Sequence, residues 1–474
     1  MIRRPAGKVV WSGAEAAASA ALSFLSVFLV ARLIGPAELG IGAAAVSAHV
    51  LLWIGVNALF ADALVQRPEV NPVQAASALW AGVGAGVLGA LLMGGLGWPI
   101  AAALGDPRLV AMCLLLALPL PLVGAAGAVQ GLLTRRRRYR ALAGRTLVGQ
   151  GLGTLAGIGF AMAGAGAWAL VLQQCVTALA GALALILRCP ERPLPVCRWA
   201  DVRALLAVGL PLTASTLVQQ ARYRVFALVI GATAGPAVLG QVHMAFRLVD
   251  TVRELAITAL WRLALPTMSE RQHDPRALQE SLDRMLALSG LVLFPAAGAM
   301  LVTLPDIVRL VLGPVWAPAG QAACLLTLLA AVSFLTFPGG VALIARGRAR
   351  RALAVSLATT LLTLAGALAL RPATPDDAAL LWIGAQLLVM PWSCLLVAGA
   401  MGAPVLAQLR AGLPALALAG VATGAAALVP AGDAGAICLR LAVGAAVYVP
   451  GALLLLRGHV RSVLQAVGLA ENLA

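Results

Sequence analysis

Polar side chains recur at helical spacing inside apolar stretches of this chain. Two adjacent stripes follow the stretch 204–231, namely Ser215, Gln219 and Arg222, and Thr216, Gln220 and Tyr223. Neither Arg222 nor Arg224 has an acidic residue within four positions on its own helix. Each therefore needs an acid from another helix or an anionic ligand. The planar guanidinium is suited to phosphate because it forms paired, charge-assisted hydrogen bonds.

A second polar stripe follows in the stretch 236–262. It consists of His243, Arg247, Asp250 and Glu254, with Arg253 beside them. These groups can pair, Arg247 with Asp250 and Arg253 with Asp250 or Glu254, or they can face a water-filled cavity. Ionisable residues inside a membrane cost about 2.5–3.5 kcal/mol each on insertion scales. Five such groups within twelve residues exceed the needs of packing and favour a cavity.

A lone carboxylate, Glu15, lies on a serine-rich face of the stretch 9–33. It is either a coupling site for a proton or Na⁺, or a salt-bridge partner of Arg222 or Arg224. Asp62 is a weaker candidate for coupling, pairing or lining a cavity. The amides Asn57, Gln173 and Gln174 are weaker candidates for lining one.

Catalysis finds no support in the motifs. The four histidines form no HxxxH pair, no GxxxxGK[ST] segment occurs, and the seven cysteines are scattered. We therefore predict a protein that is not an enzyme, with no catalytic residues, no metal site and no cofactor. Without a nucleotide-binding loop, the driving force for any transport is an ion gradient, the membrane potential or the gradient of the substrate.

The stretches that carry these residues are long enough to cross a bilayer. The chain of 474 residues is 61% hydrophobic and 11% charged, and apolar runs of about 20 residues follow one another almost without pause. We predict an all-α, polytopic membrane protein with fourteen spans: 9–33, 38–61, 75–100, 109–133, 142–164, 166–188, 204–231, 236–262, 285–311, 319–345, 352–370, 378–401, 411–430 and 435–456.

The net charge of +16 reports orientation in the membrane. With both termini in the cytoplasm, most of the 34 basic residues fall in cytoplasmic segments, six of them in 134–145. No basic domain stands apart from the spans, so nucleic acid is excluded as a partner. The run RRRRYR at 135–140 is interpreted as a topology determinant near anionic lipid headgroups, or as a direct hold on a phosphorylated substrate. Tryptophans near span ends are expected to be interfacial anchors: Trp98, Trp168, Trp261, Trp316 and Trp382.

A short segment occurs twice, 200 positions apart. GPAELG at 35–40 returns as GPAVLG at 235–240, each between long apolar stretches. Two like halves favour a transporter whose lobes rock about a shared site. We predict an N-terminal six-helix lobe (1–190), a cytoplasmic linker (191–203), a C-terminal six-helix lobe (204–401), and two additional helices with a cytoplasmic tail (402–474).

The chain resembles the polysaccharide flippases of the Wzx type, for O-antigen and exopolysaccharide, in the MATE-like MOP superfamily. The resemblance covers residues 5–370. It is carried by ARLIGPAELG (31–40), ADALVQRPEV (61–70), GDPRLV (105–110), TRRRRYRALAGR (134–145), GAGAWAL (164–170), GATAGPAVLGQVHMAFRLVD (231–250) and LGPVWAPA (312–319).

This resemblance implies two six-helix bundles around a central cavity that opens alternately to the cytoplasm and the periplasm. It implies an inner-membrane flippase that moves a polyprenyl-diphosphate-linked oligosaccharide outward, with polysaccharide polymerase and export proteins as partners. The cavity residues would be Arg222, Arg224, Gln219, Gln220, Tyr223, Arg247, Arg253 and His243. Relatives often carry an acid near the position of Phe226, so an ion-coupling role for that acid cannot be transferred.

Two other functions are weighed against the flippase. A cation-coupled multidrug antiporter of the MATE type should favour acids and aromatic residues in its cavity, whereas this chain is richer in arginine. A membrane-bound glycan polymerase or ligase usually needs a large extracytoplasmic segment. The predicted outer loops, such as 105–108 and 371–377, are too short to supply one.

Overall fold

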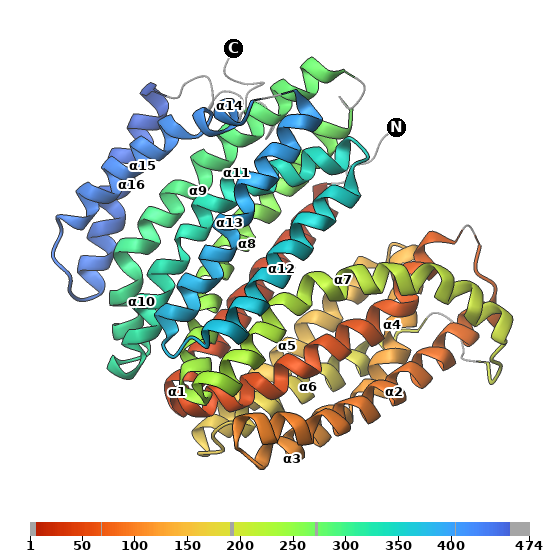
Figure 1. Ribbon diagram of the computed structural model, residues 1–474. Helices are drawn as coiled ribbons and strands as arrows, with labels where there is room; N and C mark the ends of the chain where they lie inside the picture. Colours follow the sequence, from red (N-terminus) through yellow and green to blue (C-terminus); the bar gives the residue numbers. More distant parts are fainter. Residues whose placement is uncertain (1–5, 68, 190–193, 271–273, 403, 456–474) are drawn as a thin grey trace. The chain divides into compact units, whose positions relative to one another are not determined.

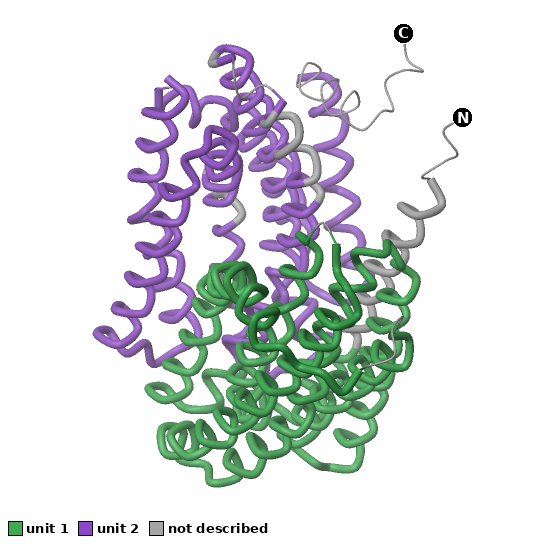
Figure 2. Tube along the Cα trace, turned by 90° about the vertical axis from the view of Figure 1, so that its right-hand side faces the viewer, with its two compact units in different colours: residues 1–240 green, residues 241–474 purple. Residues whose placement is uncertain are grey.

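The computed structural model describes residues 6–67, 69–189, 194–270, 274–402 and 404–455, and every regular element in them is helical (Figure 1). The predicted all-α class is confirmed. The chain divides into two compact units, residues 1–240 and 241–474 (Figure 2). Of the predicted linker, residues 191–193 lie outside the described ranges, as does the tail beyond residue 455. The predicted lobe boundaries remain a prediction.

Seven helices build the first unit. They are α1 (Ala6–Gln66), α2 (Pro72–Leu104), α3 (Arg108–Ala117), α4 (Leu120–Arg135), α5 (Tyr139–Met162), α6 (Trp168–Ile186) and α7 (Trp199–Ala234). Glycines let them approach closely: a Cβ on Gly82 of α2 would lie 2.3 Å from the carbonyl oxygen of Gly124 in α4. Likewise, a Cβ on Gly153 of α5 would lie 1.8 Å from the hydroxyl of Thr177 in α6. Such small residues are typical of packed helices in membranes.

The repeated segment breaks the helix at the same place in both copies. Gly35 has φ 77° and ψ 171° inside α1, and Gly235 has φ 89° and ψ 169° between α7 and α8 (Pro236–Glu270). Only glycine adopts this region readily, and the proline that follows disfavours helical geometry in the residue before it. The ten positions 31–40 also repeat, one by one, the burial classes of 231–240. The internal repeat is therefore a repeat of conformation.

The two copies also pack on one another, and both lie within the bounds of the first unit. A Cβ on Gly40 would lie 1.8 Å from the carbonyl oxygen of Pro236. Reciprocally, a Cβ on Gly240 would lie 1.9 Å from the carbonyl oxygen of Pro36. Each glycine thus leaves room for the backbone of the other copy.

The second unit contains most of α8 and the remaining described helices. They are α9 (Pro275–Val311), η1 (Pro314–Trp316), α10 (Ala317–Leu326), α11 (Leu328–Ala345), α12 (Ala349–Leu370), α13 (Pro375–Met401), α14 (Val405–Arg410), α15 (Leu413–Ala427) and α16 (Ala434–Leu455). A buried ion pair joins α16 to α9, with 2.8 Å between Arg440 Nη1 and Asp306 Oδ2. The rings of Phe294 and Phe334 pack in the apolar core at 5.0 Å between centroids.

Two of the five tryptophans predicted as interfacial anchors are core residues instead. Trp316 is 1% exposed, and Trp382 is 8% exposed. The Trp382 ring packs edge-on against Phe246 at 4.9 Å between centroids. The prediction failed here because a tryptophan near the end of a span can turn into the bundle as readily as towards the headgroups.

Each predicted span overlaps a helix in the described ranges, and ten of the described helical segments are long and apolar enough to cross a membrane. The predicted span 109–133 is divided into α3 and α4 at Leu118–Pro119, and 319–345 is divided into α10 and α11 at Thr327. Among the described helices, α5, α8, α10 and α11 are not in the set of ten. Of these, α5 and α8 carry arginines within their length.

Candidate functional site

The predicted cationic residues of α7 lie within the first unit. Arg222, Tyr223 and Arg224 are half-buried, and Gln220 is exposed. The guanidinium carbon of Arg224 lies 5.6 Å from the centroid of the Tyr223 ring, a cation–π distance. This contact holds the charged end of Arg224 beside an aromatic face. The side chain of Gln219 is outside the described part of the structure.

On α8, the polar stripe is partly paired and belongs to the second unit. Arg253 Nη2 lies 2.7 Å from Asp250 Oδ1, and Arg253 Nε lies 3.1 Å from the same oxygen. Glu254 is exposed, whereas His243 and Arg247 are half-buried. Of the two pairings considered for Arg253, the structure contains the one with Asp250. His243, Arg247 and Arg253 are thus three half-buried basic groups on one helix.

The predicted set of cavity residues thus divides between the two compact units, and its assembly into one chamber remains a prediction. Asp62 is exposed near the end of α1. The side chain of Glu15 lies outside the described part of the structure, and so does its predicted role in coupling or pairing. Among the described residues, no group of three or more His, Cys, Asp or Glu side chains could hold a metal ion.

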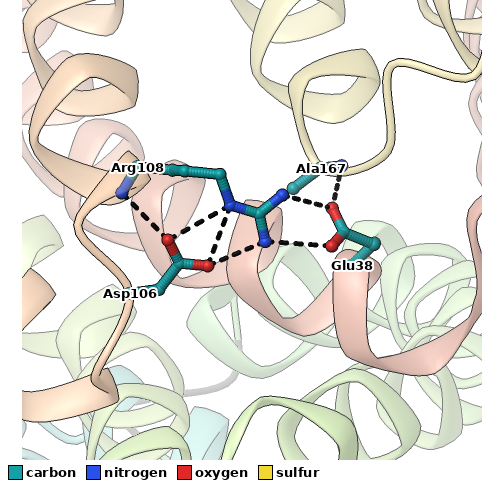
Figure 3. Close-up of polar contacts among 4 residues, drawn as sticks. All are labelled: Glu38, Asp106, Arg108 and Ala167. Atoms are coloured by element: carbon teal, nitrogen blue, oxygen red, sulfur yellow. Dashed lines mark hydrogen bonds and ion pairs between the residues drawn. The ribbon is translucent and has the colours of Figure 1, made fainter.

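A polar cluster in the first unit joins three segments through Arg108 and Glu38 (Figure 3). Arg108 Nη2 lies 2.9 Å from Glu38 Oε1 and 2.8 Å from Asp106 Oδ2. The backbone amide of Ala167, at the beginning of α6, donates to Glu38 Oε2 at 2.7 Å. Gly166 makes room for this carboxylate, because a Cβ there would lie 2.5 Å from Glu38 Oε2. We call these residues the Arg108 cluster.

Acid should weaken the Arg108 cluster. Hydrogen bonds from Arg108 lower the pKa of Asp106 below its ordinary value, against a smaller opposing effect of burial. A carboxyl whose pKa is lower in the folded state stabilises the fold above its unfolded pKa, and this stabilisation is lost as pH falls through the folded pKa. We expect the free energy of unfolding to decrease by about 1 kcal/mol below about pH 4.

The measurement is the melting temperature of the detergent-purified protein as a function of pH. Asp106→Asn should reduce the fall of the melting temperature at acid pH, which we call the acid limb. Glu69→Gln, at an exposed acid, should leave this fall unchanged. An acid limb of the same steepness in Asp106→Asn and the wild type would contradict this assignment.

Several polar residues with well-defined partners escape prediction from the sequence. Glu38 lies within a predicted span inside the repeated segment, and its partners come from segments 70 and 129 positions away. Arg145 falls at the end of a basic run that is predicted to face the cytoplasm. In the structure it lies in the second turn of α5, against Gln130 of α4 and Trp53 of α1. The change from Glu38 to Val238 between the two copies of the repeat is a signal that could have singled out Glu38.

The arrangement of the helices defines the class of protein. The structure of a protein described as "Lipid II flippase MurJ, inward closed conformation" is similar with a TM-score of 0.77 and 12% identity, covering 95% of this chain and 100% of that one. An inward-facing multidrug resistance MATE family transporter of the MOP superfamily is similar with a TM-score of 0.64 and 13% identity, covering 80% and 95%. The chain is a multi-pass, all-helical membrane protein with the fold of these transporters.

Sequence relatives narrow the class. The family model described as "Polysaccharide biosynthesis protein" matches residues 29–321, more than half of the chain. The chain belongs to this polysaccharide biosynthesis family.

Two proteins of polysaccharide biosynthesis are similar to the chain in sequence, each at less than 25% identity. The succinoglycan biosynthesis transport protein ExoT of Rhizobium meliloti (strain 1021) is 24% identical over 322 residues, covering 68% of this chain and 65% of that protein. The lipopolysaccharide biosynthesis protein WzxC of Escherichia coli (strain K12) is 22% identical over 353 residues, covering 71% and 69%. The match therefore spans about two thirds of each relative.

Proposed function

We propose that this protein is a flippase for a polyprenyl-diphosphate-linked oligosaccharide repeat unit. It moves the repeat unit from the cytoplasmic to the periplasmic leaflet of a bacterial inner membrane, for assembly of exopolysaccharide, capsule or O-antigen. Membership of the polysaccharide biosynthesis family carries this proposal. Half-buried arginines on α7 and α8 support it, because a diphosphate moving through a membrane needs cationic partners.

The proposed topology has fourteen spans, two six-helix bundles followed by two further helices, and both termini in the cytoplasm. The Gly35 and Gly235 breaks support a repeat of parallel orientation, because each break lies between two apolar helices at equivalent places. In this topology the basic run at 135–140 faces the cytoplasm and the Arg108 cluster lies near the periplasmic face.

The proposed mechanism is alternating access. A chamber between the bundles opens to the cytoplasm, and Arg222, Arg224 and Arg247 receive the diphosphate while Gln220 and His243 contact sugar. The polyprenyl tail stays in the bilayer, since its transfer into a polar chamber would expose apolar surface. Rocking of the bundles then presents the head group to the periplasm, where a polymerase and export proteins use it.

A cation-coupled multidrug antiporter is the second candidate, because its family shares the fold. Such a protein would concentrate acids at its site. In the polar stripe of α8, Asp250 instead pairs with Arg253, so this carboxylate is not available to bind a cationic drug or coupling ion.

Deleting the gene in its own host tests the proposal. We expect polysaccharide to disappear from the surface and lipid-linked repeat units to accumulate in the inner membrane, in the cytoplasmic leaflet. Loss of resistance to cationic drugs with normal polysaccharide would instead support the antiporter. Accumulation of repeat units in the periplasmic leaflet would point to a polymerase and would overturn the proposal.

A further inference from the structure

A polar cavity lies inside the first unit, among α1, α4, α5 and α6. Its volume is about 420 Å³, within the roughly 300–1,000 Å³ typical of small-molecule sites. Amide and hydroxyl side chains converge on it from all four helices: Asn57, Gln130, Thr146, Gln150, Gln174 and Thr177. The close packing of α5 on α6 at Gly153 brings Thr177 to its wall.

One positive charge faces this cavity. Arg145 donates a hydrogen bond to Gln130 Oε1, and its guanidinium carbon lies 5.7 Å from the Trp53 ring centroid. The hydrogen bond uses one of the five donors of a guanidinium. Among the described residues, no carboxylate lies within ion-pair distance of Arg145, and it carries the only charge in the cavity lining. Arg145 is half-buried, and a partly desolvated charge without a counterion is costly, so an anion in the cavity would be favoured.

A second donor in the wall has no acceptor. Asn57 is 7% exposed, and its amide nitrogen has no hydrogen-bond partner in the described part of the structure. A buried donor left unsatisfied costs about 1–3 kcal/mol. An oxygen atom of a bound ligand would satisfy this donor once the Asn57 side chain turns towards the cavity that it lines. Asn57 and Arg145 together therefore give the site more hydrogen-bond donors than the protein has acceptors for.

We propose that this cavity binds a sugar that carries one carboxylate, such as a hexuronate. A single guanidinium balances one negative charge and forms paired hydrogen bonds with a carboxylate. The surrounding amides and hydroxyls both donate and accept, as sugar hydroxyls require. The choice of a sugar rests on the proposed glycan transport, whereas the anion site rests on Arg145 and Asn57 alone. In the proposed topology the cavity lies towards the cytoplasm, where the glycan is made.

Titration calorimetry of the purified full-length protein in detergent tests the site with glucuronate, glucose and inorganic phosphate at constant ionic strength. We expect saturable binding of glucuronate. Glucose should bind at least tenfold more weakly, because it lacks the carboxylate. Phosphate should also bind at least tenfold more weakly, because it lacks the sugar hydroxyls that the amides and hydroxyls of the wall contact. Arg145→Gln should weaken glucuronate at least tenfold, whereas Arg140→Gln, at an exposed arginine of the same helix, should not.

Asn57→Ala is a second test of the site that remains available if Arg145→Gln does not fold. It removes an unsatisfied donor, so the melting temperature should hold while glucuronate binding weakens about tenfold. The inference is overturned if glucuronate does not bind the wild type, if phosphate or glucose binds equally well, or if both variants bind as the wild type does. These binding results are independent of export, so normal polysaccharide export without glucuronate binding would overturn this site alone.

Discussion

Replacing Arg222 and Arg224 together by alanine should reduce polysaccharide export about 100-fold. Each hydrogen bond between a charged donor and the diphosphate contributes about 1.5–3 kcal/mol. Loss of two such contacts removes at least about 3 kcal/mol of binding, and every 1.4 kcal/mol corresponds to a factor of ten. Both residues are half-buried in the middle of α7. The measurement is surface polysaccharide in the deletion strain carrying each variant, normalised to the amount of protein in the membrane.

Two further variants separate charge from structure. Arg203→Ala removes an exposed arginine near the beginning of the same helix and should leave export unchanged. Changing Arg222 and Arg224 to lysine keeps both charges but loses the planar fork, so export should recover in part. Normal export from a well-inserted double alanine variant would contradict an anionic cargo held by these residues.

Adding a single methyl group at Gly40 should destabilise the protein by about 3 kcal/mol. The new Cβ of Gly40→Ala would lie 1.8 Å from the carbonyl oxygen of Pro236, so backbone must move. Gly240→Ala meets the carbonyl oxygen of Pro36 at 1.9 Å and should behave in the same way. The expected result is a melting temperature several degrees lower in detergent, together with reduced export.

The matched control is Gly95→Ala in α2, where the added Cβ meets nothing within 4 Å. Alanine stabilises a helix by about 0.5–1 kcal/mol relative to glycine. This variant should therefore melt at or slightly above the temperature of the wild type. Equal melting temperatures for Gly40→Ala and Gly95→Ala would mean that the two copies of the repeat do not pack as described.

Hydropathy predicts the helices well because a bilayer demands about 20 apolar residues for each crossing. The break near residue 35 is also predictable, since a Gly–Pro step disfavours helix before the proline. The division of 109–133 at Pro119 was missed because both resulting helices are apolar. The helices α7 to α9 extend beyond the predicted spans, because their polar ends remain helical where hydropathy no longer marks them.

The polar sites were less predictable, since they depend on contacts between distant segments. The polar stripes on α7 and α8 can be recognised in the sequence because the residues of each stripe lie on a single helix at helical spacing. By contrast, Glu38 meets Arg108 across 70 positions, and Arg145 meets Trp53 across the bundle. A basic residue beside a run that is predicted to be cytoplasmic has the same sequence signature whether it faces headgroups or a cavity. The structure shows that Arg145 faces the cavity, because it lies in the second turn of α5 against Gln130 and Trp53.

The reciprocal contact of Gly40 with Pro236 and of Gly240 with Pro36 is self-complementary, as in an isologous dimer interface. It is the geometry expected if a half-length ancestor once associated with an identical copy and the two genes later fused. After fusion, each copy could diverge alone. Glu38 in one copy and Val238 in the other are such a divergence, and only Glu38 joins an ionic cluster with Arg108. The backbone conformation of the segment is the same in both copies, whereas its carboxylate is present in only one.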